Sequence, residues 1–487
     1  MMSNNEDDII RKMLQNDDDE IRIIRNLMQD DDDDDEHIPI MRPMLPDDDD
    51  DDENKDIRVV AAIDFGTTFS GFAYAYKSTP SKIFIHKKWQ NYIGYFKTPT
   101  VLKYNGSFNA MDWGYSALAE QPEKQNNKKK KKNKKKQSIT THIAERFKLH
   151  LCKMENKDKD KIYLPKGLNF KTAITDYLRK MGEVMKETLN DSGTEVDFFK
   201  QVLLIMTVPA EFDNQRIGVM RECAFNAGLI QHKNSPHLKF TTEPEAAAVN
   251  CMDILKELGV GVDKSFMVVD CGGGTVDLTT RKLLEDLEDL CPVIKQYVKG
   301  SERNEMEEEE WTIELKFGDI KNIPATAIVE GAVQYGLNRD VIATRVLKWT
   351  YGTDVARMWK SGDPDDRKIP NDGFMGMGDR IIEFSRLVKC GEEIPVNAAI
   401  PRIFTPGHVF QRFMGLDIYI TDKEDADFCD SDGVKPLGNW VIDLPITFSP
   451  RPILFFLIFG EIEISAIAVN LETGRKHETT FKFDEDF

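Results

Sequence analysis

"VVAAIDFGTTFSGFAYAY", residues 59–76, begins with an apolar run that is typical of a buried strand. Asp64 closes this run, Gly66 to Thr68 form a tight polar turn, and a second strand follows. In a dinucleotide-binding or Walker-type loop the glycine turn leads into a helix, whereas here it leads into another strand. The sequence therefore predicts a β-hairpin with a carboxylate near its tip.

A second stretch, "FMVVDCGGGTVDLTT" at 266–280, repeats this plan. An apolar strand ends at Asp270, a glycine turn with Thr275 follows, and Asp277 lies at the start of the next strand. The repetition indicates a duplicated structure in which two hairpins face each other. Either hairpin alone would be compatible with an ordinary tight turn.

The chemistry of the two turns suits the phosphates of a nucleoside triphosphate. Glycine lets backbone N–H groups approach phosphate oxygens, and threonine hydroxyls add neutral donors. Carboxylates beside phosphates repel them unless a cation intervenes, and Mg²⁺ binds few carboxylates because it keeps most of its waters. We therefore expect Asp64, Asp270 and Asp277 to hold a hydrated Mg²⁺. The expected phosphate-binding residues are Gly66, Thr67, Thr68, Gly272, Gly273, Gly274 and Thr275.

Two segments between the hairpins each predict a strand followed by a helix. Residues 201–229 read as a strand, Pro209, and an amphipathic helix that stops at Gly228. Residues 239–252 read as a strand that ends at Glu243, with Pro244 starting a helix. Glu243 thus lies at a strand-to-helix junction beside the expected cleft. The alternative interpretation is that Glu243 only caps the helix.

These segments resemble the nucleotide-binding domain of the heat shock protein 70 family, nearest its divergent member-12-like branch. The resemblance implies an α/β fold of the actin-like ATPase superfamily, which includes hexokinase, with two ribonuclease-H-like lobes around an ATP cleft. A C-terminal β-sandwich would follow. The two hairpins match the phosphate loops, and Glu243 matches the glutamate that helps place the attacking water. Pro209 matches a proline linking nucleotide state to the other domain, and Lys148 matches the lysine that contacts the γ-phosphate.

The domain organisation follows from composition and from this resemblance. Residues 1–56 hold 22 Asp and Glu against 6 Lys and Arg, so they account for most of the net charge of -19 and predict a disordered acidic tail rather than an acidic folded surface. Residues 57–354 are expected to form the nucleotide-binding domain, interrupted by a lysine-rich loop at 120–137. Residues 355–487 are expected to form a β-rich, peptide-binding-like domain with a hairpin turn at Gly474.

The sequence departs from the family between the second hairpin and residue 323. The family has most of the outer part of its second lobe there, with a glycine loop that holds adenosine, and this chain has too few residues for it. We expect that outer part to be largely missing near 280–322, which truncates the second lobe. ATP hydrolysis should then be weak at best, because one wall of the nucleoside pocket is lost.

The resulting hypothesis is an ATP-binding, chaperone-like protein of the stress response that binds unfolded or extended polypeptide segments and co-chaperones. An inactive remnant acting as a protein-binding module is the alternative, and a small-molecule kinase on the same fold is a third option. Seven scattered cysteines without a CxxC pair favour reduced thiols and a cytoplasmic protein. The lysine-rich loop is interpreted as a solvated, disordered surface loop, with a nuclear address as the alternative. No nucleic-acid partner is expected, and no membrane partner, since the longest apolar run, 453–459, is too short to span a bilayer.

Overall fold

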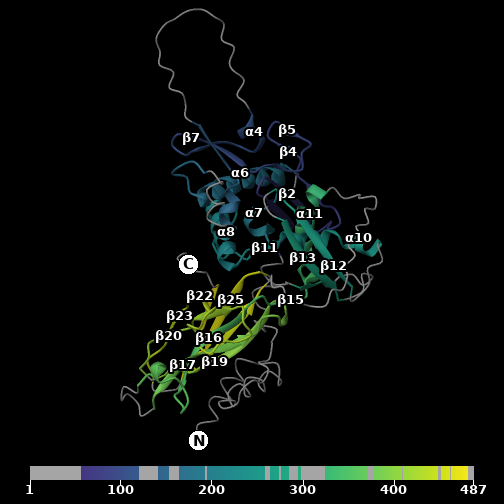
Figure 1. Cartoon of the computed structure of the whole chain (residues 1–487). Coiled ribbons are helices and arrows are strands. Elements are labelled where there is room, and N and C mark those ends of the chain that lie inside the picture. The colour runs from purple at the N-terminus through teal and green to yellow at the C-terminus, as the bar shows by residue number, and fades with distance from the viewer. Residues whose placement is uncertain are drawn as a thin grey trace, which may run out of the picture. The chain divides into compact units, whose positions relative to one another are not determined.

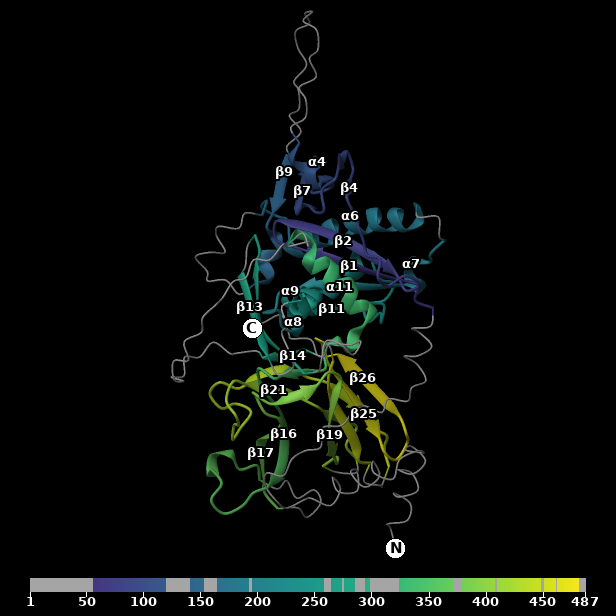
Figure 2. The ribbon, with the colours of Figure 1, turned by 90° about the vertical axis from the view of Figure 1, so that its right-hand side faces the viewer.

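The computed structural model describes residues 56–119, 141–152, 164–191, 195–257, 264–273, 276–284, 294–297, 324–370, 378–407, 410–447, 451–460 and 462–480. The chain divides into two compact units, shown in Figures 1 and 2. Among the described residues, those up to Ile294 together with 324–341 form the first unit, and those from Ile342 onward form the second together with 295–297. No helix in the described ranges is long and apolar enough to cross a membrane.

The first unit is built on a mixed sheet whose strands lie in the order β11-β10-β1-β2-β3. The first hairpin of the sequence pairs antiparallel, while the later strands add in parallel. The bounds are β1 Val59–Phe65, β2 Phe69–Tyr76, β3 Phe84–Ile85, β10 Val202–Val208 and β11 Leu238–Thr242. This order and mixture of directions are those of a ribonuclease-H-like lobe, and the predicted α/β fold class is confirmed.

Helices cover both faces of this sheet (Figure 2). Helix α11, Ala327–Leu337, packs against β1, β2 and β10, and Gly336 lies so close that a Cβ there would be 2.5 Å from Val60 Cγ1. On the other face Tyr177 of α6, Phe170–Asp191, lies with its ring 5.8 Å from that of Phe65. Successive strand residues point to opposite faces, so Val60 and Asp64 share the α11 face while Phe65 enters the aromatic core.

The second hairpin of the sequence is present as β12, Ser265–Cys271, and β13, Val276–Leu283. Its strands pair antiparallel with Asp270 opposite Asp277, as the repeated pattern predicts. Helices α9, Glu243–Asn250, and α10, Met252–Glu257, pack near it in a small apolar cluster. That cluster contains Ala248, Met252, Leu255 and Leu283, with Phe266 and Val268 packed against it.

The other elements of the first unit are short, apart from α8, Asn214–Asn226, which packs on α6. Strands β7, Val101–Asn105, β8, Ala110–Trp113, and β9, Thr141–Glu145, form a separate small sheet. The remaining pieces are β4 Lys88–Trp89, β5 Tyr92–Ile93, β6 Thr98–Pro99, α4 Gly114–Leu118, η1 Phe147–Leu151, α7 Phe198–Gln201, η2 Pro324–Thr326 and η3 Arg339–Val341.

The second unit contains two four-stranded antiparallel sheets, ordered β17-β16-β21-β22 and β19-β24-β25-β26. Side chains of both sheets contribute to one hydrophobic cluster, which includes Tyr351, Ile418, Ile400 and Phe455. The bounds are β16 Thr350–Met358, β17 Arg380–Val388, β19 Ala398–Phe404, β21 Ile418–Thr421, β22 Lys435–Gly438, β24 Ile453–Phe459, β25 Ile464–Asn470 and β26 Lys476–Thr480. Shorter elements are β14 Ile294–Tyr297, β15 Thr344–Val346, η4 Asp365–Arg367, β18 Glu393–Pro395, β20 Phe413–Gly415 and β23 Val441–Asp443.

Two predictions about this part of the chain need correction. The boundary predicted at 354/355 falls inside β16, which pairs with β17 and β21 of the second unit, so the division lies near Ile342 instead.

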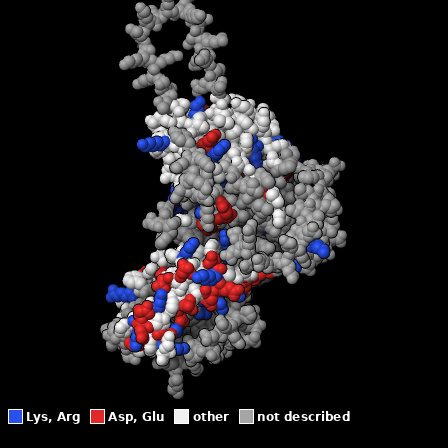
Figure 3. All heavy atoms as spheres, in the orientation of Figure 1, with Lys and Arg blue, Asp and Glu red and all other residues white. Residues whose placement is uncertain are grey.

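The second correction concerns the prediction that acidic residues belong to the tail and not to a folded surface. Acidic side chains also gather on the surface of this unit (Figure 3). Six of them, Asp422, Glu424, Asp425, Asp427, Asp430 and Asp432, follow β21. A net count conceals this patch, because basic residues such as Arg386 and Arg367 pair with part of it.

Several predictions about local structure have clear outcomes. The hairpin turn at Gly474 is confirmed between β25 and β26, and its φ of 70° is one that glycine accepts readily. The strand, Pro209 and helix predicted over 201–229 are confirmed by β10 and α8, with Gly228 at φ 74° after the helix. The acidic tail up to residue 55, the lysine-rich loop and nearly all of 285–323, where the shortened lobe is predicted, lie outside the described residues.

Candidate functional site

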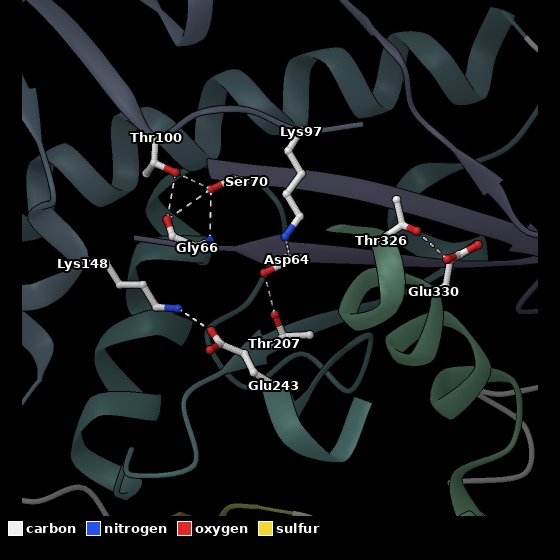
Figure 4. A network of polar contacts seen from close by, with 10 residues as sticks. All are labelled: Asp64, Gly66, Ser70, Lys97, Thr100, Lys148, Thr207, Glu243, Thr326 and Glu330. Atoms are coloured by element: carbon white, nitrogen blue, oxygen red, sulfur yellow. Dashed lines mark hydrogen bonds and ion pairs between the residues drawn. The ribbon is translucent and has the colours of Figure 1, made fainter. Parts of the chain in front are cut away.

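The turn of the first hairpin is held by two buried hydroxyls (Figure 4). Ser70 Oγ accepts a hydrogen bond from the Gly66 N–H at 3.2 Å, and Thr100 Oγ1 donates to the Gly66 carbonyl at 2.8 Å. The backbone N–H of Thr100 donates to the Thr68 carbonyl. A Cβ at Gly66 would lie 2.2 Å from the Phe69 carbonyl oxygen, so only glycine fits there. The turn is therefore held in this conformation by contacts within the protein.

The turn of the second hairpin contacts the first. A Cβ placed on Gly273 would lie 2.1 Å from Thr68 Oγ1 and 2.9 Å from Thr68 Cβ. Gly272 and Gly273 are exposed, and Thr67 and Thr68 are partly exposed. The two glycine turns predicted from the sequence thus meet, with open surface beside them. Gly274 and Thr275 lie outside the described residues, as does the side chain of Asp277, whose backbone pairs with Asp270.

Asp64 is buried under these turns at 2% exposure. The ammonium nitrogen of Lys97 lies 2.5 Å from its Oδ2, and Thr207 Oγ1 lies 3.5 Å from its Oδ1 (Figure 4). Three distant pieces of chain meet here, because β10 carries Thr207 and β6 follows Lys97 directly. The carboxylate is already compensated by a cation of the protein.

Glu243 forms a second ion pair at the base of the site. Its Oε1 lies 2.6 Å from Lys148 Nζ, and both side chains are buried. The cap of α9 is supplied by its neighbours: Thr242 Oγ1 accepts from the Glu245 N–H, and the Glu245 carboxylate accepts from the Thr242 N–H. This is a capping box, so the interpretation of Glu243 as a mere helix cap is wrong. The Glu243 carboxylate is left to face the site.

Lys148 reaches Glu243 from a single turn of 3₁₀ helix, η1. The residue before η1, Arg146, has φ 57°, a left-handed backbone that turns the chain inward. Lys148 Nζ also lies 5.7 Å from the centre of the Phe65 ring. The structure thus places Lys148, which the resemblance matches to the lysine that contacts the γ-phosphate, beside Glu243.

The charges of the cluster act on one another. Burial raises the pKa of Glu243 despite the opposing charge of Lys148, and the negative charge of Asp64 raises it further. Burial and the charge of Asp64 likewise raise the pKa of Asp270. Burial alone would lower the pKa of Lys97, but its proximity to Asp64, Glu243 and Asp270 outweighs this and raises it. Raised carboxylate pKa values in a crowded acidic cluster mark a site prepared for a cation or a proton.

The described residues thus gather Asp64, Glu243, Asp270 and Lys148, all predicted from the sequence, into one electrostatic cluster. Pro209 is buried directly after β10. Sequence reasoning missed Lys97, Thr207 and the hydroxyl pair Ser70 and Thr100. No spacing rule marks Lys97: it is brought to Asp64 by the pairing of β6 with β2, which joins segments about thirty residues apart.

Comparison with known proteins supports the resemblance read from the hairpins. No family model matches the chain. The human heat shock 70 kDa protein 12B is 26% identical over 288 residues, which cover 46% of this chain and 40% of that protein. The heat shock 70 kDa protein 12A is 20% identical in human and 28% identical in mouse over 633 positions, covering 87% of this chain and 91% of each relative.

The chain is a divergent, member-12-like relative of the heat shock protein 70 family. The family is a nucleotide-binding one. An alignment of 633 positions exceeds the 487 residues of this chain, so these relatives carry segments that it lacks.

Two solved structures also align with the chain. One is a non-polymerising mutant of MamK bound to AMPPNP, with a TM-score of 0.23 and 11% identity over 49% of this chain and 52% of that one. The other is the Aquifex aeolicus Ppx/GppA phosphatase, with a TM-score of 0.21 and 14% identity over 46% of this chain and 49% of that one.

Proposed function

We propose that the first unit binds a nucleoside triphosphate, by family resemblance ATP, with its phosphates over the turns at 66–68 and 272–275. The observation that carries this proposal is the contact of Gly273 with Thr68 beside a cluster of three carboxylates and two lysines, of which Asp64, Glu243 and Lys148 are buried. Glycine turns offer close approach to phosphate oxygens, and the lysines supply positive charge beside them.

Within this proposal Glu243 orients the attacking water and Lys148 holds Glu243 in place. The Glu243 carboxylate is a stronger base than an exposed glutamate, because its pKa is raised and so lies closer to neutral pH. Lys148 is fixed 2.6 Å away, where a phosphate oxygen arriving at the site could share its charge. Hydrolysis would then depend on positioning and charge compensation rather than on a covalent intermediate.

The expected Mg²⁺ fits this set of residues only in part. The negative charges of Asp64 and Asp270 act on each other, as a bound cation would require. The Lys97 ammonium, however, already lies 2.5 Å from Asp64 Oδ2. Among the residues whose side chains are described, no group of three or more His, Cys, Asp or Glu gathers as metal ligands. When bound with the nucleotide, Mg²⁺ would neutralise phosphate charge. The proposed protein roles of Glu243 and Lys148 do not depend on it.

Titration calorimetry with ATP, ADP and the β,γ-imido analogue of ATP tests the binding proposal. We expect dissociation constants in the micromolar to millimolar range, lost in Gly273→Val, whose side chain would push the two turns apart. Glu243→Gln should retain binding and lose hydrolysis of ATP. Failure of every nucleotide to bind at millimolar concentration would reject the proposal and favour the non-catalytic remnant.

We further propose that the second unit binds extended, apolar polypeptide segments, as a chaperone-like protein requires. Support comes from the ribbon β20–β23, in which Met414 and Ile442 are buried while Phe413 and Val441 are 59% and 60% exposed. Exposed apolar side chains on a strand pair suit an extended chain held by strand-like contacts. Fluorescence anisotropy of a labelled apolar heptapeptide should detect binding that Phe413→Ser weakens. Ile382→Ser, which removes an exposed apolar residue of β17, is the control.

A further inference from the structure

The side chain of Lys97 reaches Asp64 over Gly71, a glycine of β2. Asp64 pairs directly with Gly71 across the β1–β2 hairpin. A Cβ on Gly71 would lie 3.1 Å from Lys97 Cγ and 2.8 Å from the Phe96 carbonyl oxygen. The absent side chain thus makes room for the lysine stem, which crosses β2 toward the carboxylate on β1. Lys97 and Gly71 form one built feature rather than a chance surface contact.

The backbone of Lys97 is also fixed. The next residue, Thr98, starts β6 and pairs with Ser70, and Ser70 in turn holds the phosphate-loop turn at Gly66. The carbonyl of Lys97 accepts a hydrogen bond from the Tyr115 hydroxyl. Because the lysine is attached to the framework of the turn itself, its ammonium is positioned at Asp64 in the absence of any ligand.

The charge balance of the cluster gives this ammonium a specific part. Lys148 is engaged with Glu243 at 2.6 Å, so Lys97 is the cation at Asp64 among the described groups, and it also faces the charge of Asp270. A divalent cation binding at Asp64 would have to displace this ammonium or lie beside it against electrostatic repulsion. Lys97 and a metal ion therefore compete for the same carboxylate.

We propose that Lys97 is a resident cation of the site, which takes the place of a divalent metal at Asp64 and lets the turns hold a polyphosphate without metal. This inference rests on the proposed nucleotide binding for its ligand, but not for its effect on metal affinity. It identifies the ligand class as a metal-free polyphosphate anion, for which inorganic tripolyphosphate is the simplest probe.

The first experiment needs no nucleotide. Binding of Mn²⁺ to the full chain is followed by the loss of the free-ion signal in electron paramagnetic resonance. Wild type and Lys97→Arg should bind Mn²⁺ weakly at this site, and Lys97→Gln should bind it at least about tenfold more tightly, as removing one adjacent positive charge predicts. Asp64→Asn combined with Lys97→Gln should abolish the gain. Equal Mn²⁺ binding by wild type and Lys97→Gln would overturn the inference.

The second experiment measures tripolyphosphate and ATP binding by calorimetry with Mg²⁺ or with EDTA. We expect wild type to change less than about threefold between the two conditions, and Lys97→Gln to lose about tenfold or more in EDTA only. Lys88→Gln, an exposed lysine on β4, is the matched control. Wild-type binding that requires Mg²⁺ would overturn the inference while leaving nucleotide binding intact. If wild type binds neither anion, the proposed function fails, and the Mn²⁺ comparison still decides the role of Lys97. Should Lys97→Gln fail to fold, tight Mn²⁺ binding by wild type alone would overturn it.

Discussion

Removing Lys148 should expose how strongly the ion pair with Glu243 shapes the first unit. The two side chains are 2% and 7% exposed, and their charged atoms are 2.6 Å apart. At an effective dielectric constant of about 20, charges at that distance attract by about 6 kcal/mol, most of which offsets their desolvation. Lys148→Met leaves a buried carboxylate without its partner, so we expect the free energy of unfolding to fall by about 3–5 kcal/mol.

The same substitution should change the pH dependence of stability. Glu243 has a raised pKa in the folded protein, so the folded state binds a proton more tightly than the unfolded state. Its contribution to stability is therefore present at low pH and is lost as the pH rises through the folded-state pKa. Lys148 lowers this pKa, and without it the pKa rises further. The loss in the free energy of unfolding caused by Lys148→Met should consequently be smaller at pH 5 than at pH 8.

Hydrogen exchange in increasing urea, read from peptides of β1 and β10, measures the stability of the first unit separately from the second. The double variant Lys148→Met, Glu243→Gln serves as the control, because it removes both charges and should recover part of the lost stability. A loss below about 0.5 kcal/mol for Lys148→Met would show that the pair is solvated and is worth no more than a surface salt bridge. An equal deficit at pH 5 and pH 8 would refute the assignment of the raised pKa to Glu243.

Three further predictions concern packing and reactivity. Gly331→Ala should lower the free energy of unfolding by about 1–3 kcal/mol, because its Cβ would lie 1.8 Å from a backbone carbonyl oxygen of α9. Gly218→Ala in α8 is the control: its Cβ has open space, so the variant should be more stable by up to about 1 kcal/mol. Equal melting temperatures of the two variants would refute the close packing of α11. Burial and then the charge of a nearby glutamate raise the pKa of Cys152 to about 12, so at pH 8 its alkylation by iodoacetamide should be about a thousandfold slower than in the denatured chain, as peptide mass mapping would measure; comparable rates would contradict this. Gly273→Ala should weaken nucleotide binding in calorimetry, because its Cβ would lie 2.1 Å from Thr68 Oγ1 and push the two turns apart; unchanged binding would contradict the contact between the turns.

The hairpins could be predicted from the sequence because their signals are local. An apolar run, an aspartate and a glycine turn determine both the strand ends and the position of the carboxylate, and Asp64 and Asp270 lie where this pattern puts them. Glu243 was placed correctly for the same reason, at a strand end followed by proline. The repetition of the pattern also predicted that the two turns meet, as the contact of Gly273 with Thr68 shows.

Features that depend on pairing between distant segments could not be predicted. Lys97 is an ordinary lysine in a loop until β6 joins β2 and Gly71 leaves room for its side chain. The domain boundary was misplaced because β16 continues through it, and only its partners β17 and β21 reveal to which unit it belongs. A summed charge, likewise, says nothing about where acidic side chains gather.

The alternation of Asp64 and Phe65 along β1 has a consequence for how such a site is made. Phe65 is fully buried among Phe147 and Tyr177, while its neighbour turns to the polar side. A slip of β1 by one residue would exchange them, driving a carboxylate into an aromatic pocket and an aromatic ring out of it. A shifted register would therefore cost free energy on both faces of the strand. The packing of Phe65 in the core thus also fixes the orientation of the Asp64 carboxylate.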